Sequence, residues 1–232
     1  MIFNILTIFP LIFNSYFNES IIKRAQAKKI IKINFLNIRD YAFDKHKTVD
    51  DSPYGGGPGM LMKIEPIYQT LKAFKLKCQS ETVHSLCDKT LKQKIILLTP
   101  KGKKFNQRMA ERLSKLDKIT LICGRYEGID KRVNKLVDEK ISIGDYILTG
   151  GEVPAMIIVD AITRLLPGVL GKDASSKDET FSKEGFLEYP QYTRPEIFEI
   201  NGKKIRVPKI LLSGNHKKIK EWREKNSKQK KV

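Results

Sequence analysis

The segment at residues 142–171, SIGDYILTGGEVPAMIIVDAITRLLPGVLG, constrains the fold more than any other part of the chain. An apolar run at residues 146–148 is followed by Gly150 and Gly151, and Pro154 then opens a long apolar stretch with few charges. This order predicts a strand that turns through two conformationally permissive glycines into a helix with proline in its first turn. Such a turn lets the backbone approach a ligand closely and directs free N–H groups toward it.

A second glycine loop, GRYEGID at residues 124–130, follows the buried-strand pattern ITLIC at residues 119–123. Either loop alone could be a tight connection between a strand and a helix. Two such loops after two apolar strands instead indicate one ligand crevice, because the carboxyl ends of parallel strands meet at the same edge of a sheet.

Strand and helix patterns alternate along the rest of the first 171 residues, which predicts an α/β domain with a mainly parallel sheet. We expect strands at residues 2–8, 31–36 and 94–98, and helices at residues 11–28, 64–74, 106–115 and 130–139.

The composition changes at residues 172–183, KDASSKDETFSK, which are polar and lack apolar periodicity. We expect a flexible linker here, between a first domain at residues 1–171 and a second at residues 184–232. A helical pattern with a basic face at residues 210–222, interrupted at Gly214, predicts that the second domain is small and helical.

The chain is strongly basic, with 44 Lys and Arg against 26 Asp and Glu and a formal net charge of +18. This excess favours a polyanionic partner such as nucleic acid, although a biased composition can also enrich lysine. We expect salt-sensitive binding through basic residues that include Lys45, Lys47, Lys217, Lys218 and Arg223.

The cysteines and the N-terminus bear on the compartment. Cys78, Cys87 and Cys123 show no metal-ligand spacing and cannot all pair, which favours a reduced, cytoplasmic environment. The apolar N-terminus lacks a basic region and a cleavage site, and it is too short to cross a bilayer. We therefore expect no membrane association.

Several enzyme classes lack their motifs in this chain. There is no GxxxxGK[ST] phosphate loop and no GxGxxG after a strand, which argues against a nucleotide triphosphatase or a dinucleotide dehydrogenase. No serine or cysteine lies in a G-x-S-x-G setting, and His46, His84 and His216 form no recognisable triad or metal motif. Covalent and metal-dependent hydrolysis are therefore not supported, and no metal ligand is predicted.

The segment PYGGGPGM at residues 53–60 cannot be a helix or a central strand, so it must be a loop. Charged residues crowd its entrance, among them Lys45, Lys47, Asp50 and Asp51. Cations beside backbone N–H donors suit a phosphate, and acids suit the edge of a base, although a flexible connection is the alternative.

Arg164 lies in an otherwise apolar stretch after the glycine pair. A cation in such a place needs a partner, because an unpaired buried charge is costly. The partner is either a ligand or a structural salt bridge, for which Asp160 is the candidate acid.

Five longer strings together resemble one family. They are TVDDSPYGGGPGMLM at residues 48–62, GRYEGID at 124–130, SIGDYILTGGEVPAM at 142–156, PGVLGK at 167–172 and YTRPE at 192–196. They are similar to the bacterial tRNA (guanine-N1)-methyltransferases, the TrmD family of the SPOUT class, and the resemblance extends to about Trp222.

The resemblance implies a SPOUT-type α/β parallel sheet with a C-terminal trefoil knot, followed by a small helical domain. It implies an obligate homodimer that uses S-adenosylmethionine to methylate N1 of guanosine 37 in tRNA, 3′ to the anticodon. It also implies assistance by magnesium, with no ligands identified in this sequence. Knots are rare among folds, so residue patterns alone would not have predicted one.

The resemblance also assigns residues to the cofactor. The knot loops that would hold it comprise Leu97, Leu98, Pro100, Gly124, Tyr126, Glu127, Gly128, Ser142, Ile143, Gly144, Asp145, Tyr146, Ile147, Leu148, Gly150, Gly151 and Pro154.

Methylation at guanine N1 requires a base that removes the N1 proton and a cation beside the charge that develops on O6. Arg164 aligns with the family arginine at that oxygen. The family base is an aspartate two residues before a linker phenylalanine, and counting back from Phe181 gives Glu179. Asp178, immediately before it, is the alternative base.

Two other functions remain open from the sequence. A related SPOUT enzyme that methylates the ribose 2′-oxygen would need no base at a purine N1. A non-catalytic RNA-binding protein would need neither Arg164 nor a linker acid, so the presence of both speaks against it.

Overall fold

The structure, a computed structural model, describes residues 1–80, 91–170, 179–183 and 185–229. It divides into two compact units, Met1–Gly171 and Lys172–Val232.

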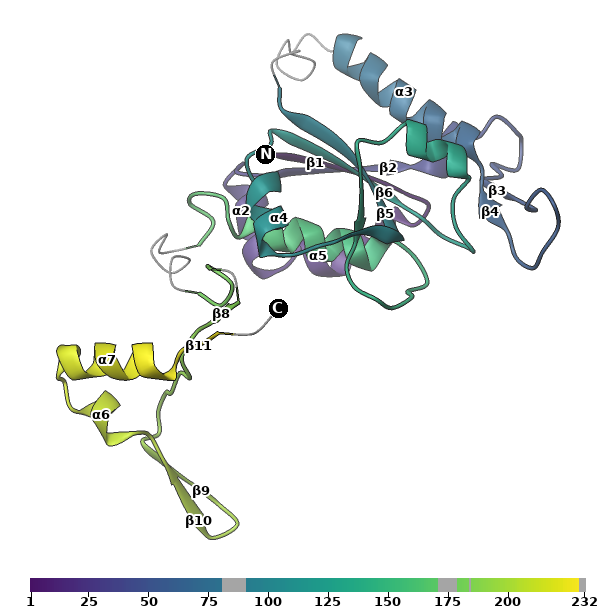
Figure 1. Cartoon of the computed structure of the whole chain (residues 1–232). Helices are drawn as coiled ribbons and strands as arrows, with labels where there is room; N and C mark the ends of the chain where they lie inside the picture. The colour runs from purple at the N-terminus through teal and green to yellow at the C-terminus, as the bar shows by residue number, and fades with distance from the viewer. Residues whose placement is uncertain (81–90, 171–178, 184, 230–232) are drawn as a thin grey trace. The chain divides into compact units, whose positions relative to one another are not determined.

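The first unit is built on a five-stranded parallel sheet with strand order β2-β1-β6-β5-β7 (Figure 1). A short antiparallel pair, β3 and β4, stands apart from it. The strands are β1 Ile2–Thr7, β2 Lys32–Asn37, β3 Asp50–Asp51, β4 Leu61–Met62, β5 Gln93–Lys104, β6 Lys118–Cys123 and β7 Glu139–Ser142.

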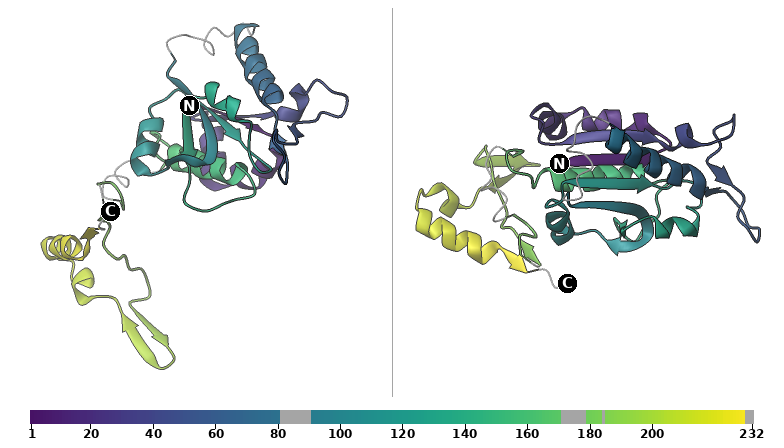
Figure 2. Two further views of the ribbon diagram at one scale, coloured as in Figure 1. Left: turned by 45° about the vertical axis from the view of Figure 1, so that its right-hand side comes forward. Right: turned by 90° about the horizontal axis from the view of Figure 1, so that it is seen from above.

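Helices cover both faces of this sheet, and Figure 2 shows the layers from two further directions. On one face pack α1 Asn14–Phe17, α2 Ser20–Ala27, α4 Gln107–Leu113 and α5 Glu152–Thr163, preceded by the 3-10 helix η1 Pro10–Phe13. On the other face pack α3 Ile64–Ser80 and the 3-10 helices η2 Ile38–Tyr41 and η3 Lys131–Lys135.

Alternation along the central strands explains the two layers. Leu121 of β6 points into the cluster with α5, whereas Ile122 points into the cluster with α3. Every residue of β6 is buried, as expected for a parallel strand that is covered on both faces. The predicted mixed α/β fold with a parallel sheet is confirmed.

Three predicted elements differ from the structure. The strand expected at residues 146–148 is wrong, because these side chains are exposed in a loop after β7. The helix expected at residues 130–139 is instead η3 followed by the start of β7. The helix expected at residues 11–28 is divided among η1, α1 and α2.

Strand β5 also runs beyond its predicted end at Thr99-Pro100. Ile141 of β7 pairs first with Leu98 and then with Lys103, so β5 bulges around it. A side-chain carbon added at Gly102 would lie 2.5 Å from the backbone of Ile141, which makes glycine necessary at this close approach.

The second unit combines short strands with two helices, so a wholly helical domain is not confirmed. Asn201 and Gly202 join β9 and β10 with φ angles of 50° and 75°, as in a type I′ hairpin turn. The predicted break at Gly214 separates the two helices. The elements are β8 Phe186–Leu187, β9 Ile197–Ile200, β10 Lys203–Arg206, α6 Lys209–Leu212, α7 His216–Asn226 and β11 Lys228–Gln229.

Candidate cofactor and active site

Chain segments that are distant in sequence meet at the carboxyl edge of the sheet. Leu98 of β5 pairs with Cys123 of β6 on one side and with Ile141 of β7 on the other. The loops that follow β6 and β7 are therefore close neighbours. In open α/β sheets this edge is where ligands bind, because loops there can close on a ligand.

The glycine pair occupies a place where backbone packs on backbone. The N–H of Gly151 donates to the carbonyl oxygen of Gly124 at 2.8 Å. A side-chain carbon added at Gly151 would lie 2.7 Å from the Cα atom of Cys123, and one added at Gly150 would collide with the Arg125 side chain. The two loops can therefore pack this closely only because positions 150 and 151 have no side chain.

A buried acid fastens the same loops to the sheet. Glu152, at the start of α5 and 1% exposed, accepts hydrogen bonds from the Thr7 hydroxyl at 2.8 Å and from Arg125 Nε at 2.9 Å. Arg125 also donates to the carbonyl oxygen of Thr149 at 3.3 Å and lies 4.8 Å from the centre of the Phe9 ring. A helix N-terminus further stabilises the carboxylate. We call Thr7, Arg125 and Glu152 the buried latch.

The loop between β7 and α5 exposes apolar side chains at this edge. Tyr146, Ile147 and Leu148 are 53%, 79% and 41% exposed. The loop is nevertheless ordered at its start, where the Ser142 hydroxyl donates to the carbonyl oxygen of Gly144 at 2.9 Å. Exposed apolar groups beside glycine-rich backbone provide a surface that an aromatic ligand would cover.

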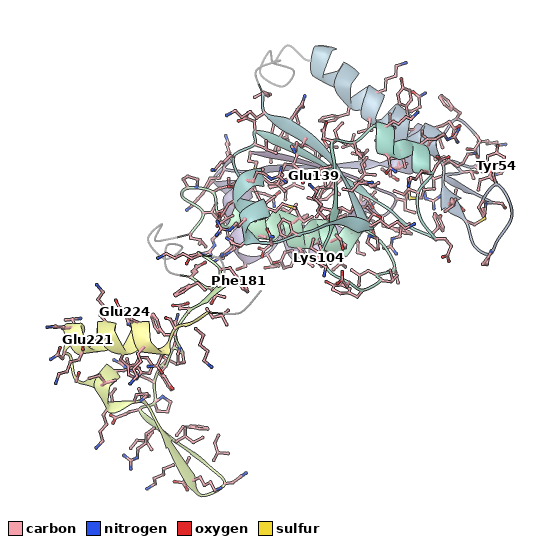
Figure 3. The ribbon with its side chains drawn as sticks, viewed as in Figure 1. Tyr54, Lys104, Glu139, Phe181, Glu221 and Glu224 are labelled. Carbon is pink, nitrogen blue, oxygen red and sulfur yellow. The ribbon has the colours of Figure 1, made fainter. Side chains whose placement is uncertain are left out.

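The glycine-rich segment between β3 and β4 packs its end against the loop after β6. The Met62 N–H donates to the carbonyl oxygen of Gly128 at 2.9 Å, and the Glu127 N–H donates to that of Met60 at 3.1 Å. Its tip is open, since Tyr54 is fully exposed (Figure 3). This segment therefore projects beside the predicted cofactor loops, where a substrate could meet it.

Tyr126 adopts a backbone conformation that is unusual for its residue type, with φ of 60°. Its hydroxyl accepts a hydrogen bond from Arg39 at 3.3 Å, and its ring is 44% exposed. Strain of this kind persists where the surrounding structure imposes it, and it is frequent at ligand sites.

The two candidate catalytic residues lie in different units. Arg164 is the half-buried C-cap of α5 in the first unit, and Glu179 is half-buried at the start of the described part of the second. Asp160, the candidate partner of Arg164, interacts with Tyr16: burial of the Tyr16 hydroxyl, together with the charge of Asp160 and a hydrogen bond to it, raises the pKa of that hydroxyl. Asp178, the alternative base, lies outside the described residues.

The structure thus brings Gly124 and Gly151 of the two loops into contact. Leu97 and Leu98, also predicted for this site, are buried in β5. Pro100 is exposed at the β5 bulge, and Pro154 lies in the first turn of α5 as predicted. Sequence reasoning missed the buried latch. Its signal was a glutamate directly after a glycine pair, at the head of an apolar helix.

Other kinds of site find no support in the described residues. They contain no group of three or more His, Cys, Asp or Glu side chains that could hold a metal ion. The same residues contain no helix that is both long and apolar enough to span a membrane.

Comparisons with known proteins agree on one family. The chain matches the family model described as tRNA (Guanine-1)-methyltransferase TrmD over residues 1–232. It is 52% identical over 228 residues to the tRNA (guanine-N(1)-)-methyltransferase of Clostridioides difficile, covering 98% of this chain and 92% of that protein. The Dictyoglomus turgidum protein of the same name is 52% identical over 224 residues, covering 97% and 84%.

A solved structure extends this similarity to three dimensions. The crystal structure of tRNA (m1G37) methyltransferase from Aquifex aeolicus matches with a TM-score of 0.73 and 39% sequence identity. The match covers 96% of this chain and 87% of that one.

Proposed function

Because the chain belongs to the tRNA (guanine-1)-methyltransferase family, we propose that it transfers a methyl group from S-adenosylmethionine to N1 of guanosine 37 in tRNA. The family predicted from the motifs is confirmed by the match over the full 232 residues. The observation that carries the function is the relatives' identity of about half the residues over nearly the whole chain.

The cofactor would bind where the loops after β6 and β7 meet at Gly124 and Gly151. The residues there fit it, because the glycine backbone allows close approach and residues 146–148 present apolar surface to an adenine ring. The buried latch holds these loops in place through the hydrogen bonds of Glu152 with Thr7 and Arg125. When bound, S-adenosylmethionine supplies a methyl group that its sulfonium already activates.

The knotted topology that the family implies is part of this proposal. It is supported by the bulge of β5 around Ile141 and by the return of the chain from β7 to the end of β6, where Gly151 bonds to Gly124. In such a topology the loops after β5, β6 and β7 would all lie at one site, and their backbone groups would bind the ligand together.

The chain's own residues supply the remaining chemistry. Guanine N1 carries a proton and becomes nucleophilic when Glu179, the proposed base, accepts it. Arg164 would place its charge beside O6, where negative charge develops as that proton leaves. Holding the guanine and the methyl group in line supplies the positional part of the rate enhancement.

A homodimer is proposed from an apolar patch on η1, α1 and α5. Leu11 is 79% exposed, and Val153 and Ile157, one turn apart on α5, are 48% and 40% exposed. Helix α5 also packs against η1, and Phe9 and Tyr16, which flank η1 or lie just after it, are likewise exposed. A second copy of the chain would cover this patch, and light scattering of an Ile157→Lys variant would detect the resulting monomer.

The proposal places the basic second unit on tRNA and the protein in the cytoplasm, where its substrate is found. Magnesium receives no ligands in this proposal, since the described residues hold no group of three or more His, Cys, Asp or Glu side chains that could bind a metal ion. No step is assigned to it.

The decisive experiment is mass analysis of nucleosides from tRNA incubated with the protein and S-adenosylmethionine. We expect 1-methylguanosine in tRNA with guanosine at position 37 and none when that position is changed to adenosine. A 2′-O-methylated nucleoside would establish the ribose-directed alternative instead. Cofactor binding without any modified nucleoside would indicate an RNA-binding protein that has lost catalysis.

A further inference from the structure

A cavity of about 800 Å³ lies in the first unit at the β7 edge of the sheet. The turn of β5 around Ile141, helix α4 and residues 134–140 form its walls. None of the predicted cofactor residues lines it, so it is a feature additional to the site described above.

The lining of this cavity is more basic than the protein as a whole. Six of its thirteen residues are Lys or Arg, whereas 44 of all 232 residues are. Only two acids, Asp138 and Glu139, oppose them. We call this surface the basic groove.

Both acids already have partners. Glu139 binds Arg112 at 2.6 Å and Lys94 at 3.0 Å, and Asp138 accepts a hydrogen bond from the Ile95 N–H at 2.7 Å. Burial raises the pKa of Glu139, but Arg112 and Lys94 outweigh it and hold that pKa below its ordinary value. Glu139 is therefore an anion that two cations neutralise.

Four cations of the basic groove are left for an outside partner. Lys101, Lys103, Arg108 and Lys140 are exposed, and none of them forms an ion pair with any residue that the structure describes. They come from two paired strands and a helix. The Phe105 N–H donates to the carbonyl oxygen of Ser142 at 2.7 Å, which fixes the end of β5 to β7.

We propose that the basic groove binds consecutive backbone phosphates of the tRNA substrate, an inference that rests on the proposed function. One phosphate needs only one or two of these cations, whereas an RNA backbone presents a phosphate at every nucleotide. The loop after β7 begins next to the groove, since Lys104, which directly follows the lining residue Lys103, pairs with Ser142 in the sheet and forms an ion pair with Asp145. RNA held there would run beside the site of methylation.

The test compares two triple variants that lose equal charge. The groove variant carries Lys103→Gln, Arg108→Gln and Lys140→Gln; the control variant carries Lys23→Gln, Lys32→Gln and Lys72→Gln, away from the β7 edge. At 0.15 M salt we expect the groove variant to raise the Kd for tRNA about tenfold and to reduce the salt dependence of log Kd by about 2–3. The control variant should change the Kd less than twofold.

Two further measurements separate the possible failures. The Kd for S-adenosylmethionine and the methylation rate at saturating tRNA should stay within twofold of wild type in the groove variant. A charge-preserving variant, Lys103→Arg with Arg108→Lys and Lys140→Arg, should bind tRNA with a Kd within twofold of wild type, which would assign the loss in the groove variant to the missing positive charge.

Equal losses in the groove and control variants would overturn the inference, because the attraction would then be diffuse. Unchanged tRNA affinity in the groove variant would overturn it as well. If wild-type protein bound tRNA but formed no 1-methylguanosine, the proposed function would fail, while the comparison of tRNA affinities would still decide the groove.

Discussion

The two units of the chain differ in how their apolar side chains are used. In the first unit the sheet carries two clusters of buried residues, with side chains such as Phe3 and Ile122 fully inaccessible. In the second, no hydrophobic side chain of the described residues is buried, and Phe198 and Ile205 are each 56% exposed.

This difference indicates that the units are stabilised in different ways. A parallel sheet covered on both faces forms a core of its own. A two-stranded hairpin such as β9–β10 is marginal alone and gains stability when another surface covers it. We infer that the first unit folds stably by itself and carries the proposed cofactor site. The second unit, by contrast, exposes apolar side chains that we expect a binding partner to cover.

The largest expected effect separates chemistry from folding. Glu179→Gln keeps the size of the side chain but removes the proton acceptor, so methyl transfer should fall about 10²–10⁴-fold while the unfolding temperature is unchanged. Single-turnover rates with saturating cofactor and tRNA would measure this. Asp178→Asn is the matched control and should be mild; the reverse ranking would move the base to Asp178.

The next effect belongs to the first unit alone. Gly151→Val should abolish binding of S-adenosylmethionine, because the added side chain would collide with the backbone at Cys123 and Gly124. Calorimetry would measure binding, and circular dichroism would check the fold. A folded variant with wild-type affinity would contradict the placement of the cofactor at the glycine pair.

A pair of truncations tests the contrast in stability directly. Ile122→Ala removes a fully buried side chain and should cost about 2–5 kcal/mol of unfolding free energy. Ile205→Ala removes an exposed one and should change stability by less than about 0.5 kcal/mol. Urea unfolding in the absence of tRNA would measure both. Similar costs would show that the hairpin is buried in the free protein.

The smallest effect concerns ion pairs. Glu139→Gln should cost about 1 kcal/mol at neutral pH, because the Glu139 side chain is 12% exposed and bound to Arg112 and Lys94. Since the folded-state pKa of Glu139 lies below its ordinary 4.5, this contribution should be lost as the pH falls from about that value through the lowered pKa.

The matching pair in the second unit is Lys220 with Glu224, on α7, at 4.0 Å and with both side chains more than half exposed (Figure 3). Glu224→Gln should change stability by no more than a few tenths of a kcal/mol. Equal effects of the two variants would mean that burial does not distinguish the units.

The sequence predicted those features that depend on local patterns. Continuous apolar runs identified β1 and β6, and the asparagine at position 106 begins α4 as a predicted helix start would, with its side chain accepting a hydrogen bond from the Met109 N–H at 2.9 Å. The loop after β6 and the start of helix α5 after Gly151 were predicted correctly, and at Gly151 glycine is a local requirement because the backbone of Cys123 lies so close.

Features that depend on long-range packing were missed. Tyr146, Ile147 and Leu148 have the composition of a strand, but they are exposed and pair with none of the strands that the structure describes. The extension of β5 past Pro100 depends on Ile141, more than thirty-five residues later. The β9–β10 hairpin did have a local signal, Asn201-Gly202, which the helical interpretation of this region overlooked.

Because Gly151 packs on Cys123, the reactivity of that cysteine can report on opening of the proposed cofactor site. Cys123 is fully buried, and this burial, with a further contribution from Glu152, raises the pKa of its thiol well above the ordinary value, so we expect slow alkylation while the site is closed. A reagent can reach the thiol only when Gly151 moves away from Cys123 at the end of β6. In a protein with Cys78 and Cys87 replaced by serine, the rate of Cys123 labelling would therefore measure how often Gly151 separates from Cys123. The factor by which S-adenosylmethionine slows this labelling would measure how much the ligand stabilises the closed state.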